Sequence, residues 1–340
     1  MKISIISDEK HLWSLLGCTR FFLSMIVLLQ HSSWAIPDSQ LKEWVSNLGS
    51  YEAVYGFLII SGFSIARSIE KKESGFYTRR FLRIYPIYFI GLSFAFILYI
   101  ILGKEVKMED GLLLSAGYFT YLANYAFLQT FICIAASYNT PLWTLSIEVF
   151  YYFISPFLNK YSFWILMSIV LISLVIHIIP IESYIYGYPA ASLGWLWILG
   201  FLFGKNQKNK IFVNLISCIL LVLIPLFTDI YRFGYQTLLI ILPIFVICFS
   251  HKIKLPVSFL KLFNYLGDLS YPLYIFHFPV FILINGLNLS NNLIFLVIAS
   301  LICAVLGDLL IDRFFNKKFL KPIIFSLIEY FRLKDRVRYL

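Results

Sequence analysis

Apolar residues along the chain gather in long runs separated by short polar segments, the pattern of helices that cross a lipid bilayer. A spanning helix needs about 20 mostly apolar residues. Ten segments meet this requirement, which predicts an all-α, polytopic membrane bundle of about ten transmembrane helices. Their ranges are 13–34, 51–69, 84–102, 141–158, 163–180, 189–204, 211–227, 233–250, 266–286 and 292–315.

The lysine and arginine residues obey the positive-inside rule under this arrangement. If the loops richest in these residues are all cytoplasmic, an even number of crossings must separate any two of them, and ten spans satisfy that parity. Both termini and 23 of the 28 Lys and Arg residues then lie on the cytoplasmic side. Only four face outward, namely Lys42, Lys104, Lys107 and Arg232.

A further apolar stretch, residues 111–134, is long enough to span the bilayer but would break this parity. It carries Thr120, Asn124 and Gln129 within its apolar run. Partial spans are tolerated where protein or water covers their backbone. We therefore expect residues 103–140 to form an outer segment whose middle re-enters the membrane.

Composition supports a membrane protein and excludes several other classes. Of the 340 residues, 60% are hydrophobic and only 14% are charged, against about 25% charged in soluble globular proteins. The mean hydropathy is +0.82. These values argue against a cytosolic enzyme, a disordered tail or a nucleic-acid-binding domain, because the net charge of +10 follows the predicted topology.

The domain organisation is expected to be simple. We find no internal repeat and no soluble domain, so residues 1–340 are interpreted as one domain. Its bundle occupies residues 13–315, and residues 316–340 form a basic cytoplasmic tail. The five cysteines contain no C-x-x-C pair, so neither a disulfide framework nor a metal site is expected. Frequent Ile, Lys and Asn favour a bacterial source, which predicts the bacterial cytoplasmic (inner) membrane as the location.

The first predicted span contains two ionisable side chains, which are costly inside a membrane and are therefore candidates for function. Arg20 and His31 are eleven residues apart, about three turns, so they share one helix face. The helical rise separates them by about 16 Å in depth, with Arg20 near the inner surface. The alternative is that both residues are structural, with the Arg20 side chain extending to the membrane interface and His31 lying at the end of the helix near the opposite interface.

Two other predicted spans also carry ionisable groups. Glu148 lies about 10 Å inside the fourth span, which begins just after Pro141. A buried carboxylate must be neutralised or paired with a basic group. His277 lies near the middle of the ninth span. A lone histidine on an apolar face is more often structural, and we assign His177 that role.

An arginine-rich segment, GFYTRRFLRIYPIY, lies at the inner mouth of the third predicted span. Arg80 and Arg83 are three residues apart and share a helix face, and Arg79 lies beside them. A guanidinium group suits bidentate binding of phosphate. The cluster therefore predicts a phosphate-binding site, whereas Lys71 and Lys72 fit an ordinary positive-inside loop.

Together these segments resemble the acyltransferase-3 family of integral membrane O-acyltransferases, from about residue 15 to about residue 285. The family opens with a basic residue, ten intervening residues and a histidine, matched by Arg20 and His31. Its S-G-F stretch is present in the second span. Its R-R-x-x-R-I-x-P block runs here from Arg79 to Pro86, and its late L-G-x-x-S-Y-x-x-Y-x-x-H motif from Leu266 to His277.

One family motif, P-L-W-S-L-S-x-E, is matched with a substitution. Thr144 replaces its first serine, and Glu148 ends it. A second acidic residue often follows that glutamate in the family, but this chain has Val149 there. The departure weakens any mechanism that needs paired carboxylates at this point.

The resemblance implies transfer of an acyl group, usually acetyl from acetyl-CoA, to a hydroxyl of a cell-surface glycan such as O-antigen, capsule or exopolysaccharide. It implies acyl-CoA as donor substrate and a surface polysaccharide or lipid-linked oligosaccharide as acceptor. The lipid bilayer is the other partner, with no nucleic acid, no permanently bound cofactor and no metal. Some members carry an outer hydrolase-like domain after the last helix, and this chain fits the stand-alone form.

The depths of the matched residues suggest a mechanism. We expect the arginines to hold the donor from the cytoplasmic side and His31 to act as general base for the acceptor hydroxyl. Glu148 would orient or charge-balance a histidine, and His277 would hold the acceptor or stabilise the oxyanion. An acetyl-histidine intermediate is a second route. The predicted donor-binding residues are Arg20, Arg79, Arg80 and Arg83, and the predicted catalytic residues are His31, Glu148 and His277.

This mechanism requires a continuous cavity from the neighbourhood of Arg83 to that of His31. A transporter or flippase of lipid-linked sugars is the alternative, since ten helices with a buried polar file would suit it. The arginine block beside a membrane histidine and the lack of an inverted repeat favour the acyltransferase. A polysaccharide polymerase would be expected to carry a larger outer loop.

Overall fold

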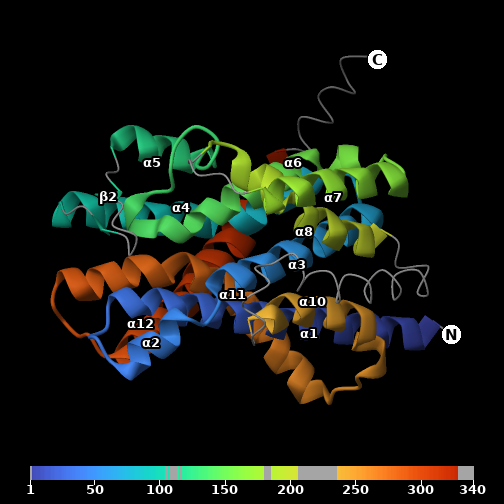
Figure 1. The fold of residues 1–340 in the computed structure, drawn as a ribbon. Helices are drawn as coiled ribbons and strands as arrows, with labels where there is room; N and C mark the ends of the chain where they lie inside the picture. The colour runs from blue at the N-terminus through green and yellow to red at the C-terminus, as the bar shows by residue number, and fades with distance from the viewer. Residues whose placement is uncertain are drawn as a thin grey trace.

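The computed structural model describes residues 2–103, 106–107, 113–114, 117–179, 185–205 and 236–327. Within these ranges the regular secondary structure is helical apart from one short antiparallel hairpin, so the predicted all-α fold is confirmed. The long helices lie side by side along a common direction (Figure 1).

The described elements follow one another along the chain with short connections. The first group is α1 (Lys2–His31), η1 (Ser32–Trp34), α2 (Gln40–Ser46), α3 (Ser50–Lys71), α4 (Phe76–Leu102), β1 (Val106–Lys107), β2 (Leu113–Leu114) and α5 (Tyr118–Tyr125). The second group is η2 (Ser137–Leu142), α6 (Trp143–Leu158), α7 (Phe163–Ile178), α8 (Tyr188–Lys205), α10 (Thr237–Phe249), η3 (Ser250–Lys252), α11 (Val257–Gly286), α12 (Leu293–Leu306) and the π-helix η4 (Gly307–Leu320).

Five of the described helical stretches are long and apolar enough to cross a membrane, and all five coincide with predicted spans. They are Glu9–Trp34, Gln40–Lys71, Phe76–Leu102, Val257–Gly286 and Leu293–Leu327. Two shorter apolar helices, Phe163–Ile178 and Thr237–Lys252, match two more. The predicted span 211–227 lies outside the described residues, and the total of ten stays a prediction.

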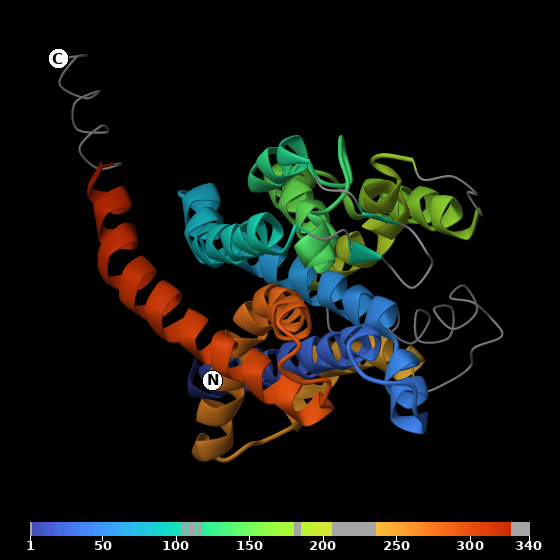
Figure 2. The same cartoon turned by 90° about the vertical axis from the view of Figure 1, so that its left-hand side faces the viewer.

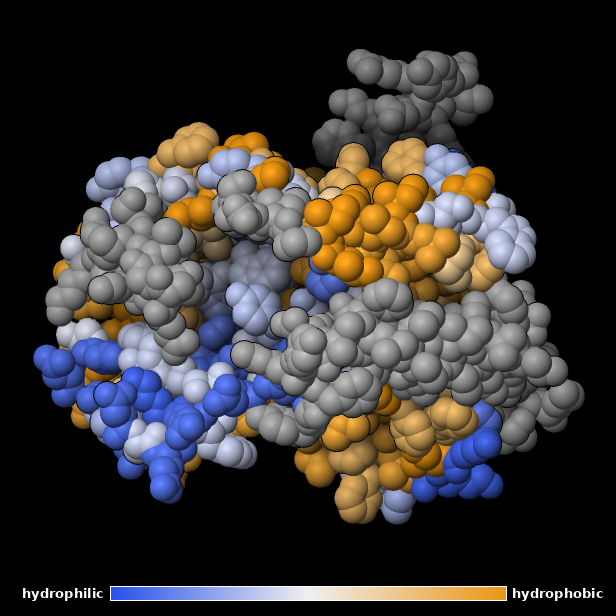
Figure 3. Space-filling model, viewed as in Figure 1, coloured by the Kyte–Doolittle hydropathy of each residue, from blue (hydrophilic) through white to orange (hydrophobic). Residues whose placement is uncertain are grey.

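Apolar side chains lie exposed over much of the helical surface, as expected for a protein surrounded by lipid. On α7, Trp164 is 76% exposed and Ile172 is 61% exposed. In the space-filling view, apolar residues cover large areas, while hydrophilic residues gather at the end of the molecule where α2 lies (Figure 3). The exposed surface therefore fits a membrane protein.

Helices α1 and α11 run parallel and form a close pair at the centre of the bundle. Ser14 bonds Asn264, and ten residues later Ser24 donates to the Ser270 carbonyl. A Cβ atom on Gly267 would lie 2.6 Å from the Gly17 Cα, so only glycine permits this approach. The parallel direction is the one that the parity argument required of the first and ninth predicted spans.

Close contact also joins α3 to α8, and it explains the S-G-F stretch of the second predicted span. A Cβ on Gly62 would lie 1.9 Å from the Trp197 carbonyl oxygen, and one on Gly200 would lie 2.1 Å from the Ile59 oxygen. Small residues let helix backbones touch in a membrane, where burying apolar surface drives association only weakly.

The segment between α4 and α6 uses the polar residues that interrupted its apolar run. Asn124 donates to the Ile134 carbonyl and accepts from the Ala136 N–H, and Gln129 donates to the Leu142 carbonyl. Both side chains are fully buried. Asn124 thereby supplies hydrogen bonds to backbone that is not helical, which is the condition for such backbone at membrane depth. Re-entry of this segment into the membrane stays a prediction.

The C-terminal helix is longer than its apolar run indicated. Helical structure continues beyond residue 315, where a basic tail was predicted to start, through η4 to Leu327. The end of the apolar run therefore does not mark the end of the helix, because Asn316 is buried and donates to the Leu82 carbonyl on α4. The helix extends along one side of the bundle and beyond it (Figure 2).

Candidate active site

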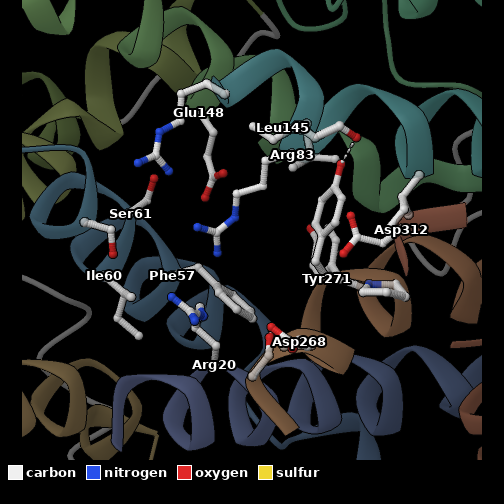
Figure 4. A pocket seen from close by; sticks show the side chains of 18 of the residues that line it. Arg20, Phe57, Ile60, Ser61, Arg83, Leu145, Glu148, Asp268, Tyr271 and Asp312 are labelled. Carbon is white, nitrogen blue, oxygen red and sulfur yellow. Dashed lines mark hydrogen bonds between the residues drawn. The ribbon is translucent and has the colours of Figure 1, made fainter. Parts of the chain in front are cut away.

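A cavity of about 460 Å³ opens between α1, α3, α4, α6, α11 and η4. All four predicted donor-binding arginines line it, with Arg20 contributed by α1 and the other three by α4. In the close view, Arg20, Arg83 and Glu148 lie on one side of the cavity, and Asp268, Tyr271 and Asp312 lie on the other (Figure 4). The structure thus brings together residues that are far apart in sequence.

The arginine cluster sits on the first turns of α4 because the connection from α3 is short. The residues between the second and third predicted spans are mostly helical, and the chain reverses between Lys71 and Phe76 with Gly75 at a φ of +71°. Arg79 secures this connection by donating to the carbonyls of Lys72 and Ser74.

Arg80 and Ser64 offer polar atoms that no described residue satisfies. Arg80 lies over the Phe76 ring, 5.7 Å from its centroid, and its Nε is buried without a hydrogen-bond partner. The Ser64 hydroxyl is also buried without one, and both residues line the cavity. Buried polar groups in native proteins are nearly always paired. These two atoms fit a cavity whose ligand completes their hydrogen bonds.

Glu148 accepts the last hydrogen bond of a directed chain. The Trp197 Nε1–H can only donate, and it donates to the Ser61 hydroxyl at 3.2 Å. Ser61 lies 3.1 Å from the Tyr152 hydroxyl, which donates to Glu148 at 2.9 Å. Arg83 and Arg20 also lie close enough to Glu148 to interact electrostatically. The Tyr152 donor and the two guanidinium groups all favour the ionised form of the Glu148 carboxyl group.

The two predicted catalytic histidines meet at the other end of the α1–α11 pair. The His31 Nδ1 and the His277 Nε2 are 3.0 Å apart, and the ring planes are within 5° of parallel. His277 is fully buried, whereas His31 retains exposed surface. The aromatic edges of Phe278 and Phe281 enclose the pair.

Hydrogen bonding determines which nitrogen of each ring carries a proton. The His277 Nδ1 faces the carbonyl oxygens of Tyr274, at 2.9 Å, and Leu273, at 3.2 Å. Since carbonyls only accept, this nitrogen is protonated and the His277 Nε2 is left with a lone pair. The His31 Nδ1–H donates to that lone pair. The His31 Nε2 is therefore the unprotonated nitrogen of the neutral pair.

The cavity and the histidine pair are separated by one aromatic wall. Tyr274 lines the cavity on one side, and on the other its ring centroid lies 6.0 Å from that of His277. Its hydroxyl bonds Thr144 at 2.8 Å and donates to the Pro141 carbonyl at 2.8 Å, and Phe57 packs edge-on against its ring. Among the described lining residues there is neither His31 nor His277.

Two details of the predicted site therefore differ in the structure. The cavity expected to run from Arg83 to His31 has Tyr274, and neither histidine, in its described lining, and the Thr144 and Pro141 oxygens hold the Tyr274 side chain in place. Glu148 was expected beside a histidine but lies with the arginines, since α6 presents it to α1 and α4 rather than to the histidine pair. The predicted depth of Glu148 in the membrane did not indicate which helix would lie beside it.

Some residues of the site were not identified from the sequence. Tyr152 lies one turn after Glu148, and this i,i+4 spacing could have indicated the contact. Tyr274 lies within the late motif but carried no role. Asp312 and Asn316, which line the cavity from η4, have no motif that marks them. His177 lies against the rings of Tyr55 and Trp195, which fits its assignment as a structural histidine.

The fold and the site define a helical membrane protein that combines an arginine-lined cavity with a pair of hydrogen-bonded histidines. A family model described as an acyltransferase domain matches residues 16–312. The chain therefore belongs to the acyltransferase-3 family, as its motifs indicated.

A curated relative supports the same class over a shorter region. Acyltransferase MdmB of Streptomyces mycarofaciens is 31% identical to this chain over 121 residues. The alignment covers 33% of this chain and 29% of that protein, so less than a third of the relative is matched. No solved structure matches the chain.

Proposed function

We propose that this protein is an O-acyltransferase that moves an acyl group from cytoplasmic acyl-CoA to a hydroxyl of a cell-surface glycan, with acetyl-CoA as the simplest donor. One observation carries the proposal: a cavity lined by four arginines is bounded at its inner wall by Tyr274, which also touches the histidine pair. The donor site and the chemical centre are thus immediate neighbours.

The donor side is supported by charge and by size. Phosphate groups of a coenzyme A thioester suit guanidinium groups, which bind them through two parallel hydrogen bonds. The free Nε of Arg80 and the Ser64 hydroxyl offer further donors for phosphate oxygens. A volume of about 460 Å³ lies within the range of pockets that bind small molecules and cofactors.

The chemical step uses the unprotonated nitrogen of His31. In direct transfer, the His31 Nε2 takes the proton from the acceptor hydroxyl as the new C–O bond forms. The C–S bond of the thioester then breaks, and the proton passes to the thiolate sulfur, which leaves an ester and free coenzyme A. In the alternative route, the same nitrogen first accepts the acyl group. Both routes depend on His277, which orients the His31 ring by accepting from its Nδ1.

Tyr274 is proposed to control access between donor and base. A thioester whose phosphates contact the arginines reaches His31 only when the Tyr274 ring turns aside or the pantetheine arm displaces it. Two hydrogen bonds of its hydroxyl hold the ring in place. Such a wall keeps the bound thioester away from His31 until the ring moves, and so limits transfer of the acyl group to water.

Glu148 is proposed to position the arginines. Its carboxylate accepts from Tyr152 and lies near Arg83 and Arg20. A negative charge here reduces the mutual repulsion of the guanidinium groups while the cavity is empty and limits their conformational freedom. This role replaces the one expected from the sequence, in which Glu148 supported a histidine.

The proposal is tested with purified protein in detergent. Acetyl-CoA labelled in its acetyl group is mixed with surface polysaccharide from a strain of the source organism that lacks the gene. We expect thermal stabilisation of the protein by acetyl-CoA and transfer of label to the polysaccharide. Absence of both would contradict the proposal, and movement of lipid-linked sugars across vesicles without acylation would favour a flippase.

A further inference from the structure

Asn316 is a buried polar side chain on η4 that faces the cavity. It is 5% exposed, lines the cavity and donates through its Nδ2 to two oxygens. One is the Leu82 carbonyl, at 2.5 Å, and the other is a carboxylate oxygen of Asp312, at 3.0 Å. The bond to Leu82 ties η4 to α4 between the positions of Arg80 and Arg83.

The orientation of this amide is determined by its partners. A carbonyl only accepts, and Asp312 is ion-paired with Lys317 at 2.6 Å, so its ionised carboxylate also only accepts. The nitrogen of Asn316 must therefore face both, and its Oδ1 points the other way. That oxygen is buried and has no hydrogen-bond partner among the described residues. A buried acceptor without a donor costs free energy, so a ligand that brings an N–H or O–H is favoured here.

The place of Asn316 along the cavity selects the part of the donor that reaches it. The thioester must point toward Tyr274, and the phosphates contact the arginines of α4. Cavity-lining residues continue past Asn316 to Lys317 on η4 and to Lys321 in the next turn of the helix. The end of the donor beyond its phosphates, the nucleoside, therefore lies along η4. Phosphates at neutral pH offer almost no donors, whereas an adenine ring offers an exocyclic amine.

We infer that Asn316 binds the nucleobase of the donor, with its Oδ1 accepting a hydrogen bond from the exocyclic amine. The inference rests on the proposed function and assigns one residue to donor selectivity. Asn316 lies beyond residue 312, where the match to the family model ends. The selectivity thus comes from a helix that continues beyond the matched region and contacts α4 through Asn316.

The test compares two ligands on two proteins, all in the full-length chain in detergent. The ligands are coenzyme A and its analogue in which hypoxanthine replaces adenine, so that an oxygen replaces the amine. We expect wild-type protein to bind coenzyme A about tenfold or more tightly than the analogue. The analogue loses the hydrogen bond from the exocyclic amine and brings its own oxygen against the Asn316 Oδ1, which repels it. In Asn316→Leu we expect the two ligands to bind with about equal affinity.

Two controls separate this effect from misfolding. 4′-Phosphopantetheine lacks the nucleoside, so its affinity should be the same in wild type and Asn316→Leu if the cavity is intact. Lys318→Ala changes an exposed neighbour that does not line the cavity, and it should keep the wild-type preference. Because the ligand comparison on wild type needs no variant, a folding defect in Asn316→Leu cannot obscure the result.

Each outcome bears on the inference. Equal binding of both ligands by wild type, or a preference that persists in Asn316→Leu, would overturn the role of Asn316 and leave the proposed function standing. If wild type binds neither ligand, the proposed donor fails and this inference fails with it.

Discussion

The arginine-lined cavity and the histidine pair differ in how completely the protein satisfies their polar atoms. The cavity draws side chains from six elements and leaves buried atoms of Arg80, Ser64 and Asn316 without partners among the described residues. The histidine pair comes from two helices, and three of its four ring nitrogens have identified partners. A binding region is thus completed by its ligand, whereas the chemical centre is organised beforehand.

The packing beneath each region accounts for this difference. Helices α1 and α11 touch backbone to backbone at Gly17 and Gly267, so the two histidines further along are held in a fixed register. Around the cavity, η4 reaches α4 through Asn316 and α11 through the ion pair between Arg313 and Asp268. Space for a large ligand exists where the helices diverge, and rigidity exists where they are in contact.

The largest expected effect comes from removing the proposed base, His31, while the arginine-lined cavity stays intact. We expect His31→Ala to lower the rate of acyl transfer by about 10²- to 10⁴-fold, the usual contribution of a general base, and to leave the affinity for coenzyme A unchanged. Transfer assays with labelled donor and binding measured by calorimetry provide the two values. A large loss of coenzyme A affinity would mean that the two regions are not separate.

Loss of the positioning histidine should have the next largest effect. In His277→Ala, the His31 ring loses the acceptor for its Nδ1–H, so either nitrogen can carry the proton. We expect a fall of roughly 10-fold to 10²-fold in kcat with KM for the donor unchanged. His277→Asn, whose side-chain oxygen can accept from His31, should recover part of the rate, and failure to recover any would argue against the tautomer assignment.

A change on the cavity side should show the opposite kinetic pattern. Arg80→Ala removes a guanidinium group with a free buried donor, and charge-assisted hydrogen bonds contribute about 1.5–3 kcal/mol each. We expect donor affinity to fall by about 10- to 100-fold with kcat nearly unchanged. The matched control, Lys72→Ala, alters an exposed basic residue outside the cavity and should leave donor affinity within about twofold. A kcat effect for Arg80→Ala would place Arg80 nearer the chemistry than the structure does.

The smallest expected effect concerns the wall between the regions. Tyr274→Phe keeps the ring but loses the hydrogen bonds to Thr144 and Pro141. We expect transfer to change by less than about threefold, while hydrolysis of acetyl-CoA without acceptor rises, because the ring turns aside more often. Release of free thiol from acetyl-CoA, followed with and without acceptor, measures both. An unchanged hydrolysis rate would show that the hydroxyl does not hold the wall closed.

Several elements of this protein followed from local pattern. Five long apolar runs became five membrane-length helices, and the Arg20–His31 spacing placed one residue at the cavity and the other at the histidine pair. Charge parity kept 111–134 from being interpreted as a full span, and its polar residue Asn124 bonds non-helical backbone. Hydrophobic periodicity and residue type specify these features without reference to distant parts of the chain.

Lateral contacts could not be obtained in the same way. Nothing in the fourth predicted span distinguished a Glu148 beside a histidine from one beside Arg83, and no motif marked Asn316 as buried. The partners of these side chains depend on which helix faces pack together. The packing in turn depends on the surfaces of several helices at once.

By itself, the sequence determined how far along each helix a group lies, because the rise per residue is fixed and apolar runs match the bilayer thickness. It thereby placed the arginines at one end and His31 at the other. Only the tertiary structure decided that His31 contacts His277, that Glu148 joins the arginines and that Tyr274 closes the path between them. The physical reason is that neighbours across the bundle depend on close packing of whole helix surfaces, such as the contact at Gly17 and Gly267, and no single segment encodes that contact.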